Sequence, residues 1–144
     1  MDSHHIDLVQ STFASVVPIS DLASRIFYDE LFALEPDLRA LFADDLTEQR
    51  RKLMMMLGAA VNGIGDWEST APVVRELGSR HVGYGVQPAH FGAVGAALLT
   101  TLEKGLGDAF TPAVREAWTE CYVLISSEMK DAMLAAGTPE VASV

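Results

Sequence analysis

Residues 31–42 read LFALEPDLRALF, and this stretch decides the fold. Phe32 belongs to an amphipathic helical pattern, but Glu35 precedes a proline, and a helix rarely continues through that position. The chain therefore bends at Glu35, and Pro36 opens a second, short helical turn that ends just before an acidic loop. The bend moves Phe42 out of line with Phe32, so this ring is directed at another part of the molecule.

The rest of the chain reads as helices on either side of this bend. Apolar residues recur every three or four positions, and nothing supports a long β-strand, so the predicted fold class is all-α. The pattern predicts helices over about 3–17, 20–34, 47–64, 70 to the glycines of HVGYGV, 88–106 and 112–136. Ser20, Thr70 and Thr111 are the expected N-caps, and residues 137–144 are expected to fray.

Length and composition bound the possible functions. The 144 residues predict a single domain over 1–144, and 49% apolar with 21% charged residues is a globular composition. No apolar run approaches the roughly 20 residues of a membrane span, and the N-terminus does not resemble a secretory signal, so we expect a cytoplasmic protein. A net charge of −10 disfavours nucleic acid and anionic membranes as partners. Cys121 is the only cysteine, which excludes an intrachain disulfide and suggests a buried thiol.

Three polar residues stand where a core pattern would place leucine: Tyr28, Gln49 and His81. A buried polar group without a partner costs free energy, so each either bonds within the protein or faces a ligand. Each has an ordinary interpretation. A lone histidine is more often a hydrogen-bonded core residue than a ligand, Gln49 can be a helix-end residue that reaches solvent, and the Tyr28 hydroxyl can bond a backbone carbonyl. The residues alone leave these alternatives open.

Other catalytic and metal-binding patterns are weak. His4, His5 and His90 do not combine with cysteine or carboxylates at metal-site spacing, and no Glu-x-x-His pair is present for a di-iron centre. Neither a glycine-rich phosphate loop nor an ordered Ser/His/Asp set stands out.

Four stretches carry a family resemblance: LFALEPDLRALF, QRRKLMMMLGAAV, LGSRHVGYGV and LEKGLGDAFTPAVREAW. Their order and separations resemble those of the globins, in particular the single-domain bacterial globins related to neuroglobin. The resemblance covers about residues 6–133. It implies the globin fold, with a pocket for haem b between the distal and proximal helices. It also implies reversible O₂ binding at the iron, with NO and CO as further ligands.

The resemblance assigns residues to this pocket. His81 is the implied proximal iron ligand, and the Leu77 carbonyl is the implied acceptor for the other imidazole N–H. Phe42 is the implied ring that packs flat on the haem, which explains the bend at Glu35. Further implied haem-lining residues are Leu53, Leu57, Leu77, Val86, Phe91, Val94 and Ile125. Lys52 and Arg80 are candidate partners of the haem propionates.

On the distal side the resemblance makes Tyr28 and Gln49 the donors to bound dioxygen. Glutamine is a poor iron ligand, so the internal bis-histidyl state of neuroglobin is not available from Gln49.

The sequence departs from the flavohaemoglobins at two places. They carry a Tyr and a Glu beside the proximal histidine, where this chain has Phe91 and Met133, and no flavin or NAD(P)H domain is evident. The main hypothesis is therefore an oxygen-binding protein. The alternatives are an NO dioxygenase or nitrite reductase that depends on a separate reductase, a gas sensor, and a helical domain without haem. The oligomeric state is left open.

Overall fold

The computed structural model describes residues 1–83 and 87–142, without the side chains of residues 81–83, 88 and 136–142. Over these residues the elements are α1 (Ser3–Val16), η1 (Val17–Ile19), α2 (Ser20–Leu34), η2 (Pro36–Leu41), α3 (Thr47–Gly63), α4 (Trp67–Gly83), η3 (Pro88–His90), α5 (Phe91–Leu106), η4 (Gly107–Ala109) and α6 (Pro112–Ala142), where η marks a 3₁₀ turn. No strand occurs among them. The all-α prediction is confirmed.

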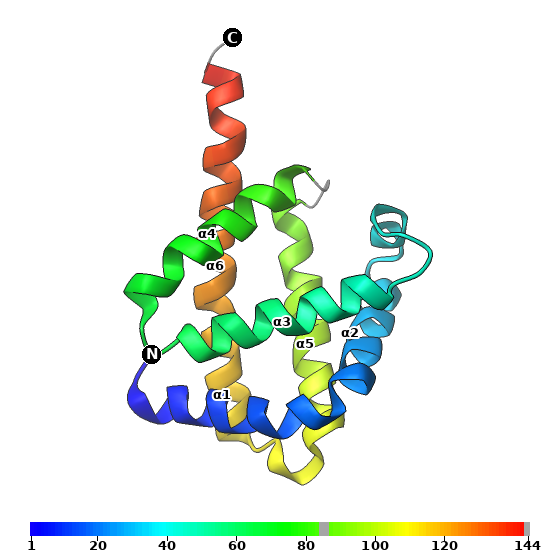
Figure 1. Ribbon diagram of the computed structural model, residues 1–144, viewed down its shortest axis with the longest axis vertical. Coiled ribbons are helices and arrows are strands. Elements are labelled where there is room, and N and C mark those ends of the chain that lie inside the picture. Colours follow the sequence, from blue (N-terminus) through cyan, green and yellow to red (C-terminus); the bar gives the residue numbers. More distant parts are fainter. Residues whose placement is uncertain (84–86, 143–144) are drawn as a thin grey trace.

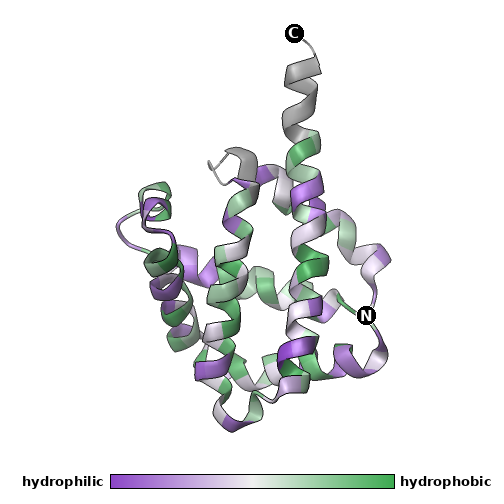
Figure 2. Ribbon diagram, turned by 180° about the vertical axis from the view of Figure 1, so that it is seen from behind, coloured by the Kyte–Doolittle hydropathy of each residue, from purple (hydrophilic) through white to green (hydrophobic). Residues whose placement is uncertain are grey.

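The helices cross one another in two layers. Helix α4 packs on α6, α2 on α5, and α1 on α6. Figure 1 shows α3 passing in front of α5 and α4 passing in front of α6. Seen from behind, α5 and α6 come to the front, with apolar residues along both (Figure 2). None of the described helices is long and apolar enough to span a membrane.

The centre of the core is the junction of α1 and α6. Trp118 is fully buried, and its ring lies 6.3 Å from the ring of Phe13, measured between centroids. The indole N–H of Trp118 donates to the Thr12 hydroxyl oxygen at 2.8 Å, so this buried polar group is satisfied inside the core. Cys121 lies one turn further along α6, and burial raises the pKa of its thiol to about 12, which confirms the predicted buried thiol.

A glycine allows α4 to approach α6 closely. A Cβ atom added at Gly78 would lie 2.5 Å from the carbonyl oxygen of Met129, which no real side chain tolerates. Gly78 is therefore required by the packing of the two backbones. Because His81 is only three residues further along α4, this contact also sets where the last turn of α4 lies.

Several helix ends differ from the sequence predictions. The Ser20 cap is wrong: Ile19 occupies the N-cap position, and the Ser20 hydroxyl donates back to the Val17 carbonyl of η1. Thr70 is also not a cap, because α4 begins at Trp67 and the Thr70 hydroxyl donates instead to the carbonyls of Gly63 and Asp66. The Thr111 cap is confirmed, since its hydroxyl accepts from the backbone N–H of Val114 at 3.2 Å.

The last helix ends later in the structure than the sequence pattern predicts. Helix α6 continues past the predicted end near Ala136 to Ala142, and the fraying expected for residues 137–144 stays a prediction. The glycine and proline at 137 and 139 led to that prediction. Both lower helix propensity, but neither forbids continuation of a helix that is already formed.

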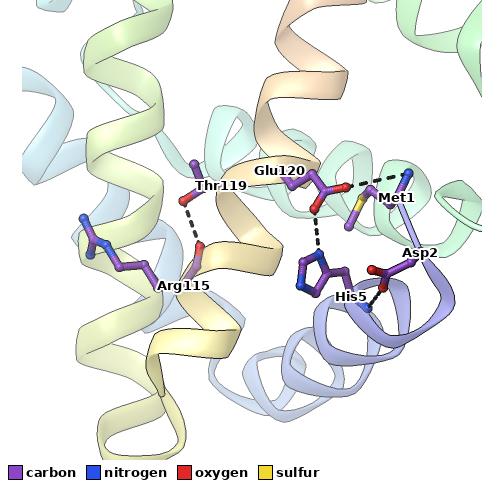
Figure 3. Close-up of polar contacts among 6 residues, drawn as sticks. All are labelled: Met1, Asp2, His5, Arg115, Thr119 and Glu120. Atoms are coloured by element: carbon purple, nitrogen blue, oxygen red, sulfur yellow. Dashed lines mark hydrogen bonds and ion pairs between the residues drawn. The ribbon is translucent and has the colours of Figure 1, made fainter.

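The buried Trp118–Thr12 bond makes a specific contribution to stability. Replacing Thr12 by Val keeps the shape but leaves the indole N–H without an acceptor, so we expect a loss of about 1–3 kcal/mol in the free energy of unfolding. Urea denaturation measures it. Thr119→Val is the matched control, because that exposed hydroxyl bonds only the Arg115 carbonyl of its own helix, and it should change stability by less than about 0.5 kcal/mol (Figure 3). Equal effects of the two variants would contradict this role of Thr12.

A second link between α1 and α6 depends on pH. The Nδ1 atom of His5 lies 2.6 Å from a carboxylate oxygen of Glu120, and the His5 backbone N–H donates to Asp2 (Figure 3). The bond to Glu120 is the main reason why the pKa of His5 is raised above its usual value of 6.5, and the charges of Asp2 and Glu116 act in the same direction. The charged imidazolium is thus favoured in the folded state.

The sign of the pH dependence follows from this raised pKa. The stabilisation by His5 is fully present below the unfolded pKa and is lost as pH rises through the folded pKa. We expect the difference in unfolding free energy between wild type and His5→Gln to be larger near about pH 5.5 than near about pH 8.5. His4→Gln, the same change at the exposed neighbouring position, is the control. A difference for His5→Gln that is constant or grows with pH would contradict the ion pair.

Candidate functional site

The bend after α2 brings Phe42 back against the helix that precedes it. Glu35 has φ −134° and ψ 80°, so α2 ends there and η2 turns the chain. The Phe42 ring then lies 5.6 Å from the ring of Tyr28 and 5.5 Å from that of Phe32, measured between centroids. The half-buried Phe42 therefore lies beside one of the three polar residues that the sequence singled out.

Tyr28 and Gln49 meet across the interface of α2 and α3. The side-chain amide of Gln49 donates to the Tyr28 hydroxyl oxygen at 3.2 Å. Tyr28 is only 4% exposed, and burial raises the pKa of its phenol, with the bond from Gln49 acting weakly in the opposite direction. The structure gives Tyr28 and Gln49 each other as side-chain partners, which the sequence alone left open.

The direction of this bond decides what Tyr28 can do. Its oxygen accepts from Gln49, so its own proton is free to donate elsewhere, and no acceptor for it lies among the residues described. The phenol also stays protonated well beyond neutral pH, because its pKa is raised. Tyr28 is thus a preorganised hydrogen-bond donor.

Several apolar side chains of the predicted pocket are only half-buried by protein atoms. They come from four helices and from the loop after η2. Six of the predicted pocket residues are half-buried, namely Phe42, Leu53, Leu57, Leu77, Val94 and Ile125. Apolar side chains at inner helix positions are usually fully covered in a core. Partial cover on so many of them fits a surface that packs against a large apolar group.

The proximal residues Phe91 and Met133 are both buried, with 7% and 4% exposure. The backbone carbonyl of Phe91 accepts from the Tyr122 hydroxyl at 2.6 Å, and Lys130 Nζ lies 6.0 Å from the centroid of the Phe91 ring. Neither side chain can accept or donate a strong hydrogen bond. These two positions therefore cannot increase the basicity of a neighbouring imidazole.

The two candidate cations both reach solvent. Arg80 pairs with Glu76 at 2.7 Å, and together with Leu77 it lines a groove of about 370 Å³ between α3 and α4. Lys52 is exposed on α3, and among the described residues its ammonium group forms no hydrogen bond or ion pair. Both are able to reorient toward an anionic group at the protein surface.

Two predicted site residues cannot be compared with the structure. The backbone of His81 belongs to the last turn of α4, but its side chain lies outside the described residues, and Val86 lies outside them entirely. Among the described residues no cluster of His, Cys, Asp and Glu could hold a metal ion. The assignment of His81 therefore stays a prediction.

One residue of the site was missed by sequence reasoning. Arg39 lies in η2, three residues before Phe42, and its guanidinium donates to backbone carbonyls of the loop that carries this ring. The available signal was an arginine at i−3 from the predicted haem-contacting phenylalanine. Nothing in the sequence says which acceptors such an arginine chooses.

A family model described as Globin matches residues 25–129, which include every residue assigned above to the pocket except the proximal-side Met133. The chain belongs to the globin family. It is 30% identical over 131 residues to the Flavohemoprotein of Bacillus subtilis. The aligned region covers 88% of this globin and 32% of the relative. It is 31% identical over 118 residues to the Neuroglobin of Tetraodon nigroviridis. This alignment covers 72% of the globin and 74% of the relative.

Structural comparison agrees. The bacterial globin from Campylobacter jejuni superposes with a TM-score of 0.81 at 23% sequence identity, covering 92% of this globin and 96% of that chain. At this identity the likeness shows the shared fold. The globin spans about a third of the length of the flavohemoprotein it matches.

The described residues fit a haem group, the cofactor of this family. The half-buried apolar side chains on α3, α4, α5 and α6 are of the kind that packs against a porphyrin. A protonated tyrosine with no protein acceptor among the described residues stands on the distal side, and exposed cations are available for carboxylates. No cysteine motif for covalent attachment is present, because the only cysteine, Cys121, is buried in the core.

Proposed function

We propose that this globin binds haem b noncovalently through His81 and reversibly binds O₂, with NO and CO as further ligands. Bound haem would supply an iron atom able to bind a diatomic ligand. The observation that carries the proposal is the Gln49–Tyr28 hydrogen bond, whose direction leaves the Tyr28 proton available for such a ligand.

The chain's own residues have distinct roles in this proposal. Tyr28 donates a hydrogen bond to the bound gas, and Gln49 holds the Tyr28 oxygen so that its proton points away from α3. Phe42, Leu53 and Leu57 exclude water from the distal side. On the other side, the Leu77 carbonyl is the proposed acceptor that orients the imidazole of His81.

Hydrogen bonding from Tyr28 should affect the retention of O₂ and of CO differently. Bound O₂ is a good hydrogen-bond acceptor, whereas bound CO is a weak one. A single hydrogen bond of about 1–2 kcal/mol corresponds to roughly 5- to 30-fold in a dissociation rate. The proposal therefore predicts discrimination in favour of O₂ retention, which a change at Tyr28 should remove.

The test is to measure O₂ and CO dissociation rates for wild type and Tyr28→Phe by rapid mixing. Tyr28→Phe keeps the ring in the aromatic cluster and removes only the hydroxyl. We expect O₂ to leave roughly 5- to 30-fold faster, with a much smaller change for CO. An equal acceleration of both gases would show that the variant changes access to the pocket, and the donor role of Tyr28 would be wrong.

A second candidate function is NO dioxygenase activity with a separate reductase. It is favoured by the 30% identity to a flavohemoprotein and by the presence of the Tyr28 and Gln49 donors in this chain. In that reaction NO and bound O₂ combine to nitrate, and the iron loses one electron. Because Phe91 and Met133 are buried and apolar, neither of these two positions offers a carboxylate or phenol to assist it. A basic reductase would be attracted to a protein with a net charge of −10.

The oxygenated protein should react with NO once and then stop in the ferric state. The measurement is NO consumption over many equivalents with NADH as the only added reductant, followed by addition of cell extract. No turnover with NADH alone, and none with extract, is the result expected of an oxygen-binding protein. Turnover that needs extract and falls as salt rises would instead favour the enzyme with a basic reductase partner.

A further inference from the structure

We propose that Arg39 is a positioning residue for Phe42, because it clamps the loop that carries this ring to the end of η2. The inference rests on the proposed function, in which Phe42 packs against the haem. It adds a residue outside the pocket whose side chain determines how firmly the haem is held.

The guanidinium bonds three consecutive backbone carbonyls. One terminal nitrogen of Arg39 donates to the carbonyls of Phe42 at 3.4 Å and Ala43 at 3.0 Å, and the other donates to that of Asp44 at 2.9 Å. The backbone N–H of Phe42 in turn donates to the Arg39 carbonyl at 3.2 Å. Phe42 is therefore held by Arg39 through both its N–H and its C=O.

These bonds do more than cap η2. The 3₁₀ turn ends at Leu41, and all three acceptors of the guanidinium follow that residue. A cap would satisfy carbonyls inside the turn. Arg39 instead orders extended backbone, since Phe42 has φ −117° and ψ 156° and would otherwise begin a flexible acidic loop.

The same side chain also supports the ring from the aromatic cluster. The Arg39 guanidinium carbon lies 5.4 Å from the centroid of the Phe32 ring, within cation–π distance, and the Phe32 ring lies 5.5 Å from the Phe42 ring. Arg39 thus bonds the Phe42 backbone directly. It also contacts the Phe32 ring, which packs against the Phe42 ring. Three residues form a closed set of contacts.

Five arginines pair with a carboxylate, whereas Arg39 and Arg115 do not among the described residues. Acidic residues outnumber basic ones by 20 to 10, and Arg25, Arg51, Arg75 and Arg80 all pair with a carboxylate. No such pair of Arg39 occurs among the described residues, although Asp44 is close enough to offer its backbone oxygen. Lysine could not replace Arg39, because one ammonium group cannot span the acceptors that a planar fork reaches.

The experiment compares haem release from holoprotein. Wild type, Arg39→Met, Arg39→Lys and Arg25→Met are mixed in the ferric state with an excess of apomyoglobin, and haem transfer is followed by absorbance. Arg39→Met keeps an aliphatic stem over Phe32 and removes the donors. Arg25→Met removes an exposed α2 arginine that pairs only with Asp21. The unfolding free energy of each haem-free variant is measured in parallel.

We expect Arg39→Met to release haem about tenfold faster than wild type, with Arg39→Lys closer to Met than to wild type and Arg25→Met unchanged. Amide hydrogen exchange at residues 42–44 should accelerate in both Arg39 variants, while the haem-free stability stays close to that of wild type. Release at the wild-type rate would overturn the proposal. So would faster release that merely follows a loss of global stability. Failure of the wild type itself to take up haem would instead be a failure of the proposed function.

Discussion

The Glu35–Pro36 bend is the constraint on which the distal site depends. Proline has no N–H for a helix and disfavours the helical conformation of the residue before it, and α2 ends at Leu34 with Glu35 as its C-cap. The short turn that follows reverses the chain and returns Phe42 to the face of α2 that carries Tyr28. Without this reversal the aromatic cluster would lose the ring that joins the loop to the helix. Arg39 then holds the reversed segment in place through the carbonyls that follow the turn.

The distal side depends on a hydrogen bond to a buried phenol, whereas the proximal side depends on the close approach of two helix backbones. On the distal side a buried phenol needs a partner, and the Gln49 amide provides one while leaving the phenol proton free. On the proximal side α4 must lie close to α6, and Gly78 allows backbone contact with Met129 where a side chain would not fit. The half-buried apolar residues between these two places are the part of the molecule that its own core does not cover. Together these features support the proposal that this globin holds a haem group and that Tyr28 donates a hydrogen bond to its ligand.

Strong periodic patterns and proline positions were sufficient to predict the helices and the bend, and the resemblance of four stretches to the globins predicted the family. They were insufficient for local bonds that depend on distant partners. The Ser20 and Thr70 hydroxyls were expected to cap helices. Ser20 donates instead to the Val17 carbonyl, and Thr70 donates to the Gly63 carbonyl. The partner of Tyr28 lies 21 residues away in sequence, and its side-chain amide donates to the phenol oxygen. Arg39 was missed because an arginine in an acidic protein suggests a carboxylate partner, and only the folded loop offers three carbonyls instead. The side chain of His81 remains a prediction.

The central claim is that His81 binds the iron of a noncovalent haem b. The most direct test is the visible spectrum of purified wild type and His81→Gly in the ferrous and CO-bound forms, each with and without added imidazole. The account predicts a ferrous haem b spectrum that CO converts in wild type, its loss or alteration in His81→Gly, and its recovery when imidazole fills the space left by the side chain. A His81→Gly protein with full haem content and an unchanged ferrous spectrum in the absence of imidazole would contradict the account.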